Sequence, residues 1–153
     1  MPVATETAVT APRRRILVVD DDLVIRKTLS TKLKAHGFEV LTAVDGSEAV
    51  STARKEKPDL ILLDISFPPD VGHGGGVPWD GFLIMNWIRR MDEAKHIPII
   101  MIAGGDPAKQ EQHALDAGAV AFFGKPIDHD RLIEVIRSTL KGSDPSPTPT
   151  NEI

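Results

Sequence analysis

The sequence of 153 residues contains no cysteine. This absence excludes disulfide bonds, thiolate metal sites and cysteine nucleophiles together. No apolar run approaches the roughly 20 residues of a membrane-spanning helix, and the N-terminus lacks the apolar centre of a signal peptide. The net charge is -4 without a long basic run, so a nucleic-acid-binding surface is not indicated. We therefore expect a cytoplasmic protein that partners neither a membrane nor a nucleic acid.

The composition is that of a globular protein with polar ends. Hydrophobic residues make up 41% of the chain, which is enough for a proper core at this length. Residues 1–13 are rich in Ala, Thr and Pro, and residues 142–153 are polar and rich in proline. We expect both ends to be disordered tails around one domain at residues 14–141.

Short apolar runs alternate along the chain with segments of helical periodicity. The first helical segment carries Ile25, Leu29 and Leu33 on one face, and Gly37 is placed to end it. Runs of four to six apolar residues suit strands that are buried on both faces. The predicted strands cover residues 16–19, 38–42, 60–64, 97–102 and 119–123. This repeated β–α pattern predicts an α/β fold with a doubly wound, five-stranded parallel sheet.

Charged residues follow three of the predicted strands. Asp20 and Asp21 come after the first strand, Asp64 ends the third, and Lys125 follows the fifth. In a doubly wound sheet whose first and third strands are adjacent, these residues meet in the crevice at the carboxyl ends of the strands. Crowded carboxylates repel one another, and a hard divalent cation such as Mg²⁺ relieves that repulsion.

A metal ion, a lysine and a carboxylate together suit the binding of a phosphoryl group. Lys125 supplies a positive charge for an anion beside the metal. Asp64 is the natural nucleophile, because carboxylates form aspartyl phosphates. Each piece alone has an ordinary explanation, since an Asp-Asp pair commonly caps a helix and a Lys-Pro pair commonly forms a turn. Their joint placement at the strand ends favours the functional interpretation.

Three motifs resemble those of a known family. Val18-Val19-Asp20-Asp21, Asp64 with Pro68 four residues later, and Lys125-Pro126 are similar to the receiver domain of two-component response regulators, the CheY-like domains. The resemblance covers about residues 14–141. It implies a flavodoxin-like (βα)5 fold with strand order 2-1-3-4-5.

The resemblance also implies a role for each motif residue. Asp64 accepts a phosphoryl group from the phosphohistidine of a sensor kinase or a phosphotransfer protein. Asp20 and Asp21 form the acidic pair, with Asp21 a direct ligand of Mg²⁺, and the backbone carbonyl of Ser66 is a further ligand. Lys125 pairs with the phosphoryl group. Such a protein is a phosphoacceptor that modifies itself rather than an enzyme.

The two switch positions of the family depart from its usual pattern. The family usually places Thr or Ser at the end of the fourth strand, where the hydroxyl moves to the phosphoryl group, but this sequence has Ala103. The aromatic switch position on the fifth strand is Phe122, which has no phenolic hydroxyl. Loss of these contacts weakens the link between phosphorylation and conformational change, because a ligand shifts an equilibrium only through differential contacts. The backbone amides of Gly104 or Gly105 are candidate substitutes.

The loop after the third strand is the second departure. About nine residues, roughly 69–77, are inserted before the Asp80-Gly81 pair. They form either a lid or partner-specific contact, or a tolerated surface insertion, because loop closure entropy grows slowly with length. His73 lies in this insertion, but three glycines follow it and no second ligand lies beside it in the sequence, so a metal site there is disfavoured.

Three functional hypotheses follow. The leading one is a stand-alone receiver whose output is a contact with a downstream protein. We expect a protein contact because no DNA-binding segment follows the last predicted helix. The family precedent places that contact on residues 107–140. The second is a receiver that no longer switches and acts as a binding module, as Ala103 suggests. The third is a haloacid-dehalogenase-like phosphatase that uses Asp20 and Asp22. The missing hydroxyl on the fourth strand and the lack of room for a cap domain count against the phosphatase.

Overall fold

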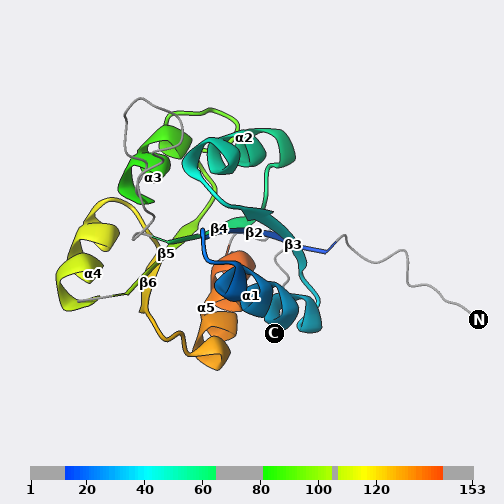
Figure 1. The fold of residues 1–153 in the computed structure, drawn as a ribbon. Helices are drawn as coiled ribbons and strands as arrows, with labels where there is room; N and C mark the ends of the chain where they lie inside the picture. The colour runs from blue at the N-terminus through cyan, green and yellow to red at the C-terminus, as the bar shows by residue number, and fades with distance from the viewer. Residues whose placement is uncertain (1–12, 65–80, 105–106, 143–153) are drawn as a thin grey trace, which may run out of the picture.

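The computed structural model describes residues 13–64, 81–104 and 107–142. Within these ranges the chain alternates strand and helix, and Figure 1 labels the elements. The strands are β2 (Arg15–Val19), β3 (Glu39–Ala43), β4 (Leu60–Asp64), β5 (Ile99–Ala103) and β6 (Ala121–Gly124). The helices are α1 (Leu23–Ala35), α2 (Gly46–Glu56), α3 (Gly81–Arg89), α4 (Pro107–Asp116) and α5 (His129–Gly142).

The strands form one parallel sheet with the order β3-β2-β4-β5-β6. The first strand in the chain, β2, therefore lies between the second and the third, and the chain then continues outward to β6. This arrangement confirms both the predicted α/β class and the predicted strand order 2-1-3-4-5. The reversal of direction beside β2 creates a crevice at the carboxyl ends of β2 and β4.

Helices cover both faces of the sheet and divide the core into two clusters. Figure 1 shows α2 and α3 on one side of the sheet and α1 and α5 on the other. Leu17 and Val19 pack in the cluster on the α2–α3 side, whereas Ile16 and Val18 pack in the cluster on the α1–α5 side. Side chains alternate across a strand, so a strand covered on both faces needs apolar residues at every position. This need explains the unbroken apolar runs of the sequence.

Local signals set the ends of the first two helices. The side chain of Asp22 caps α1 by accepting hydrogen bonds from the backbone of its first turn. After α1, Gly37 takes a left-handed conformation with φ of 92°, as expected for a helix-ending glycine. At α2, Asp45 accepts a hydrogen bond of 2.8 Å from the Glu48 N–H, and Glu48 accepts one of 2.8 Å from the Val44 N–H. The first bond makes Asp45 the N-cap of α2, and the second ties the first turn of the helix to the residue before the cap.

Three strands begin later than the apolar pattern predicts. The predicted runs start at Phe38, Ile97 and Ala119, but these residues lie in the turns that precede β3, β5 and β6. They are nonetheless buried, with exposed fractions of 7%, 2% and 7%. Burial of turn residues extends the apolar pattern beyond the hydrogen-bonded ladder. At the other end of β5, Ala103 is the last residue of the strand rather than the first residue after it.

Several predictions concern residues outside the described ranges. The terminal tails, apart from their innermost residues 13 and 142, lie there, as do the inserted loop at 69–77, Ser66 and His73. Within the described ranges, none of the helices is long and apolar enough to cross a membrane.

Candidate functional site

The register of the sheet brings the charged residues together. Val19 of β2 is paired with Leu63 of β4, so Asp20 and Asp64 follow on neighbouring strands at the same level. On the other side of β4, Ala103 of β5 is paired with Gly124 of β6, and Lys125 comes next. Parallel strands end at the same edge, and all of these residues therefore reach one crevice.

Three carboxylates and one ammonium group form the centre of this crevice. Asp20, Asp21 and Asp64 each offer one carboxylate oxygen, and these oxygens lie within 4.8 Å of one another. The Lys125 Nζ lies 3.5 Å from an oxygen of Asp20 and 3.4 Å from an oxygen of Asp64. Asp20 and Asp64 are each 2% exposed, whereas Asp21 is open to solvent. The four residues that the sequence singled out are thus in mutual reach.

Lys125 reaches the carboxylates by crossing the end of β5. Its backbone N–H donates a hydrogen bond of 2.8 Å to the Ala103 carbonyl, and the peptide bond to Pro126 is cis. A Cβ atom on Gly104 would lie 3.8 Å from the Lys125 Cδ, so the lysine side chain passes close over this glycine. Small residues at 103 and 104 therefore leave a path for the lysine.

Two hydrogen bonds hold the backbone of Asp20, and a third holds its side chain. Its N–H donates to the Ala43 carbonyl over 3.2 Å, and its carbonyl accepts a hydrogen bond of 2.8 Å from the Arg26 guanidinium. Its carboxylate accepts a hydrogen bond of 2.9 Å from the Asp22 N–H. Sequence reasoning missed Arg26, because a basic residue in the first turns of a helix is too common to be a signal.

The pKa values of the buried groups reflect their crowding. Burial raises the pKa of Asp20, and the hydrogen bond from the Asp22 N–H and the charge of Lys125 offset this only in part. Burial lowers the pKa of Lys125, but attraction to Asp64 and Asp20 outweighs burial, so the pKa of this lysine is raised. The lysine therefore stays charged beside the carboxylates.

The donor set suits a hard divalent cation. Carboxylate oxygens are the ligands that Mg²⁺ takes in proteins, and Mg²⁺ usually retains several waters. Asp21 lies on the open side, where such waters have room, while Asp20 and Asp64 face it from the buried side. Asp20, Asp21 and Asp64 are therefore the described residues that would hold the ion.

Asp22 is occupied elsewhere. Its carboxylate accepts hydrogen bonds of 2.8 Å from the Val24 N–H and 3.4 Å from the Ile25 N–H, and thereby caps α1. The acidic cluster found among the described residues does not include Asp22. An Asp-x-Asp site built on Asp20 and Asp22 would require this cap to be broken.

The two switch positions lie on the same face of the sheet. Ala103 is fully buried in the cluster on the α2–α3 side, and Phe122 is half-buried against that cluster. Met101 is paired with Phe122, so Ala103 lies two residues farther along on the same face. Both positions can pack, but neither carries a hydroxyl group.

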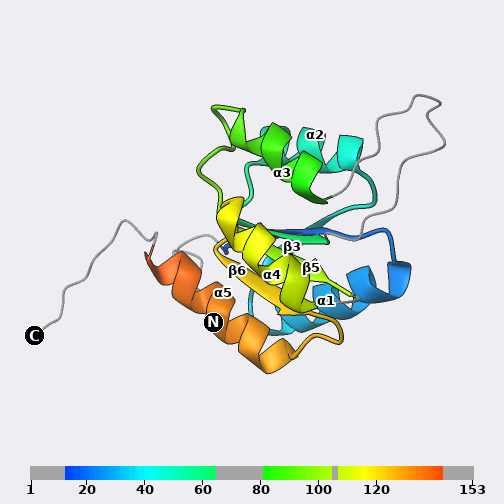
Figure 2. The ribbon, with the colours of Figure 1, turned by 90° about the vertical axis from the view of Figure 1, so that its left-hand side faces the viewer.

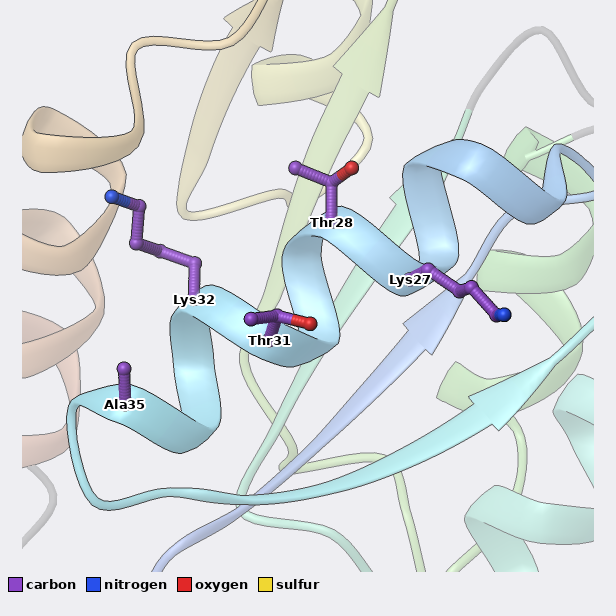
Figure 3. Close-up of a pocket in the computed structure, with 5 residues that line it drawn as sticks. All are labelled: Lys27, Thr28, Thr31, Lys32 and Ala35. Carbon is purple, nitrogen blue, oxygen red and sulfur yellow. The ribbon is translucent and has the colours of Figure 1, made fainter.

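The outer surface of α1 is basic beside the acidic crevice. The helix contains Arg26, Lys27, Lys32 and Lys34 and no acidic residue. A hollow of about 470 Å³ on this helix is lined by Lys27, Thr28, Thr31, Lys32 and Ala35. Figure 3 shows its two lysines extending to opposite sides with the threonines between them. This hollow does not include the carboxylate cluster, but it makes α1 complementary to an acidic surface.

Comparison with known proteins decides the family. The sequence model of the response regulator receiver domain matches residues 16–137. The chain belongs to this family. Receiver domains bind Mg²⁺ at an acidic pocket and interact with histidine kinases or phosphotransfer proteins, and they are typically not catalytic enzymes.

Relatives of different lengths resemble this receiver. It is 31% identical to the polar-differentiation response regulator DivK of Brucella anthropi, covering 83% of this chain and 96% of DivK. It is 33% identical to the transcriptional regulatory protein PrrA of Mycobacterium tuberculosis, covering 96% of this chain and 58% of PrrA. The chemotaxis response regulator CheY4 of Vibrio cholerae has a similar structure, with a TM-score of 0.71, 29% identity and coverage of 83% and 98%. The chain thus spans little more than half of PrrA.

Proposed function

We propose that this receiver accepts a phosphoryl group on Asp64 within a two-component phosphorelay. The donor is the phosphohistidine of a sensor kinase or a phosphotransfer protein, and the output is a contact with a downstream protein. Asp20, Asp21 and Asp64 hold Mg²⁺, and the Ser66 carbonyl is a further ligand. The observation that carries the proposal is the buried Asp64 carboxylate, 3.4 Å from the Lys125 ammonium in a cluster of three carboxylates.

The proposed transfer moves the phosphoryl group from a histidine nitrogen to an oxygen of Asp64. An Asp64 oxygen attacks phosphorus, the bond between phosphorus and the donor histidine nitrogen breaks, and that nitrogen keeps the electron pair and takes up a proton. Mg²⁺, when bound, offsets negative charge on the phosphoryl oxygens. Lys125 pairs with a phosphoryl oxygen once the group is attached, because its ammonium already faces Asp64.

The basic surface of α1 supports the choice of a protein donor. This helix begins directly beyond the acidic crevice, and its first two residues, Leu23 and Val24, are 56% and 70% exposed. Exposed apolar residues beside a basic surface favour a partner with an acidic rim around an apolar centre. A donor that docks on α1 also brings its histidine to the open side of the crevice.

Labelling with acetyl phosphate tests the phosphoacceptor. The wild-type chain with Mg²⁺ is expected to gain one acid-labile phosphoryl group, detected by intact mass, and Asp64→Asn is expected to gain none. Asp22→Asn is the matched control, because asparagine is also a good helix cap and the cap is the role of Asp22 in the structure. Equal labelling of Asp64→Asn and wild type would exclude Asp64 as the acceptor.

A receiver that binds without switching is the second candidate, favoured by Ala103. The buried position has no hydroxyl to follow the phosphoryl group. Beryllofluoride with Mg²⁺ distinguishes the candidates by amide chemical shifts. Shifts confined to the crevice, with α4 and α5 unchanged, support the non-switching receiver, whereas shifts that reach these helices support a switch. Phosphatase turnover that survives Asp64→Asn but is lost in Asp20→Asn would instead support the haloacid-dehalogenase-like alternative.

A further inference from the structure

A groove between α2 and α3 lies outside the site described above. It has a volume of about 280 Å³ and is lined by Ser47, Val50, Ser51, Arg54 and Lys55 of α2 and by Trp87 of α3. Figures 1 and 2 show α2 and α3 side by side on the face of the sheet opposite α1 and α5. The groove is therefore separated by the sheet from the proposed donor-docking surface.

Trp87 gives this groove an apolar wall that solvent reaches. The residue is 45% exposed, although its neighbour Ile88 is fully buried in the core. Tryptophan is enriched among the residues that dominate binding energy at protein interfaces. The floor is apolar as well, because Val50 is half-buried against the core cluster on this side. Binding a partner here would remove a large apolar surface from water at little cost in side-chain ordering.

One end of the groove is positive. Arg54 and Lys55 are exposed in the last turn of α2. Neither residue forms an ion pair with another residue in the described ranges. The neighbouring Glu56 faces Arg15 at 3.2 Å, and Glu48 is held by the Val44 N–H. The two cations thus form a local positive end on a chain whose net charge is -4.

The spacing of the α2 residues defines the shape of the occupant. Residues 47, 50, 51, 54 and 55 follow the i, i+3, i+4, i+7, i+8 rule, so they form a continuous stripe along the helix. Ser47 is small and allows another backbone to approach closely. Two helices side by side with an apolar floor are the usual receptor for a third, amphipathic helix.

We propose that this groove is a docking site for an amphipathic helix of a partner protein that carries acidic residues at one end. The apolar face of that helix packs on Val50 and Trp87, and its acidic end pairs with Arg54 and Lys55. The surface is distinct from the proposed phosphoacceptor site and from the predicted output face at residues 107–140. The receiver then engages a second partner without obstructing phosphotransfer.

Site-specific photo-crosslinking in the native host tests the proposal. Benzoylphenylalanine is placed at Ser51 in the groove, and at the exposed His96 in the turn before β5, outside the predicted output face, as the control. The Ser51 probe is expected to give a discrete adduct at least tenfold stronger than the control, and mass spectrometry of the crosslinked peptide is expected to identify an acidic, amphipathic helical segment.

Second substitutions in the Ser51-probe protein decide whether the groove residues carry the binding. Trp87→Ala and the double variant Arg54→Glu/Lys55→Glu are each expected to reduce the adduct at least tenfold, whereas Arg131→Glu on α5 leaves it unchanged. Thermal melts of all variants verify that they fold, and the charge reversal provides a second readout if Trp87→Ala unfolds. The proposal is overturned if there is no discrete adduct, if the adduct survives both groove variants, or if the crosslinked peptide is non-acidic or comes from this chain.

Discussion

Replacing Asp20 with asparagine is expected to stabilise the metal-free protein at neutral pH, although it removes an ion pair. Asparagine keeps the shape of the side chain and an oxygen that can accept the 2.9 Å hydrogen bond from the Asp22 N–H. Lys125 also keeps a carboxylate partner, because its Nζ lies 3.4 Å from Asp64. The substitution therefore leaves no buried charge without a counter-charge, which is the usual cause of large losses when a buried pair is broken.

Two Coulomb energies of opposite sign nearly cancel at Asp20. At an effective dielectric constant of about 20, attraction to the Lys125 Nζ at 3.5 Å is worth about 4.7 kcal/mol. Repulsion from Asp64, whose oxygen lies within 4.8 Å, costs at least about 3.5 kcal/mol on the same scale, and Asp21 adds to it. Burial disfavours the charged form of Asp20, and it makes the net effect of this charge on stability unfavourable. The raised pKa of Asp20 agrees with this conclusion. We expect a gain of about 1 kcal/mol, or about 4 °C in Tm.

Urea denaturation in EDTA measures this gain, and its pH dependence tests the cause. Because folding raises the pKa of Asp20 above its ordinary 3.8, the stability linked to its proton is fully present below that value and is lost as pH rises through the folded-state pKa. The advantage of Asp20→Asn over wild type is thus expected to grow with pH above 3.8. A variant that is less stable than wild type in EDTA at pH 7, or an advantage independent of pH, would refute the reasoning.

Mg²⁺ is expected to make wild type more stable than Asp20→Asn, the reverse of the order expected in EDTA. A ligand at 100 times its Kd stabilises the folded state by about 2.7 kcal/mol, and Asp20→Asn loses one of the proposed ligands. Wild type is therefore expected to melt higher than the variant in excess Mg²⁺ and lower in EDTA. Na⁺ at matched ionic strength separates specific binding of Mg²⁺ from charge screening.

Four further substitutions test the site and the fold. Lys125→Gln is expected to slow acetyl phosphate labelling by roughly 100-fold, because it removes the charge that faces Asp64; equal rates would argue against its role. Leu62→Ala, at a position 1% exposed, is expected to cost about 2–5 kcal/mol in urea denaturation. Asp45→Ala removes the N-cap of α2 and is expected to cost about 1 kcal/mol. Gly37→Ala is expected to cost about 1 kcal/mol through its φ of 92° rather than through contacts, as nothing lies near its Cβ position.

The main features of the fold could be read from local sequence patterns. Unbroken apolar runs such as Leu60–Leu63 mark strands covered on both faces, and the alternation of these runs with helical periodicity indicates a parallel sheet. Asp22 and Gly37 mark the ends of α1 because caps depend on a few neighbouring residues. The strand starts were less accurate, since Ile97 is buried in a turn and burial alone does not distinguish a turn from a ladder.

The residues of the site could be predicted because the end of a strand is a local feature of the sequence. Parallel strands end at the same edge of a sheet, so residues that follow them lie close together. Asp20, Asp64 and Lys125 each follow a strand, and their convergence needs only the strand order that the resemblance implied. The proposed roles of these residues await the labelling and Mg²⁺ experiments.

Long-range contacts were decided by the tertiary structure alone. The passage of Lys125 over Gly104 and the hold of Arg26 on the Asp20 carbonyl depend on register and on side-chain direction across elements. The groove beside Trp87 likewise exists only because α3 packs against α2 and leaves that indole half in solvent. In the sequence, Trp87 is simply one more apolar residue of a helix. Local patterns determine which helices and strands form and where they end. The exposure of a side chain and its contacts with other elements depend on how those helices and strands pack.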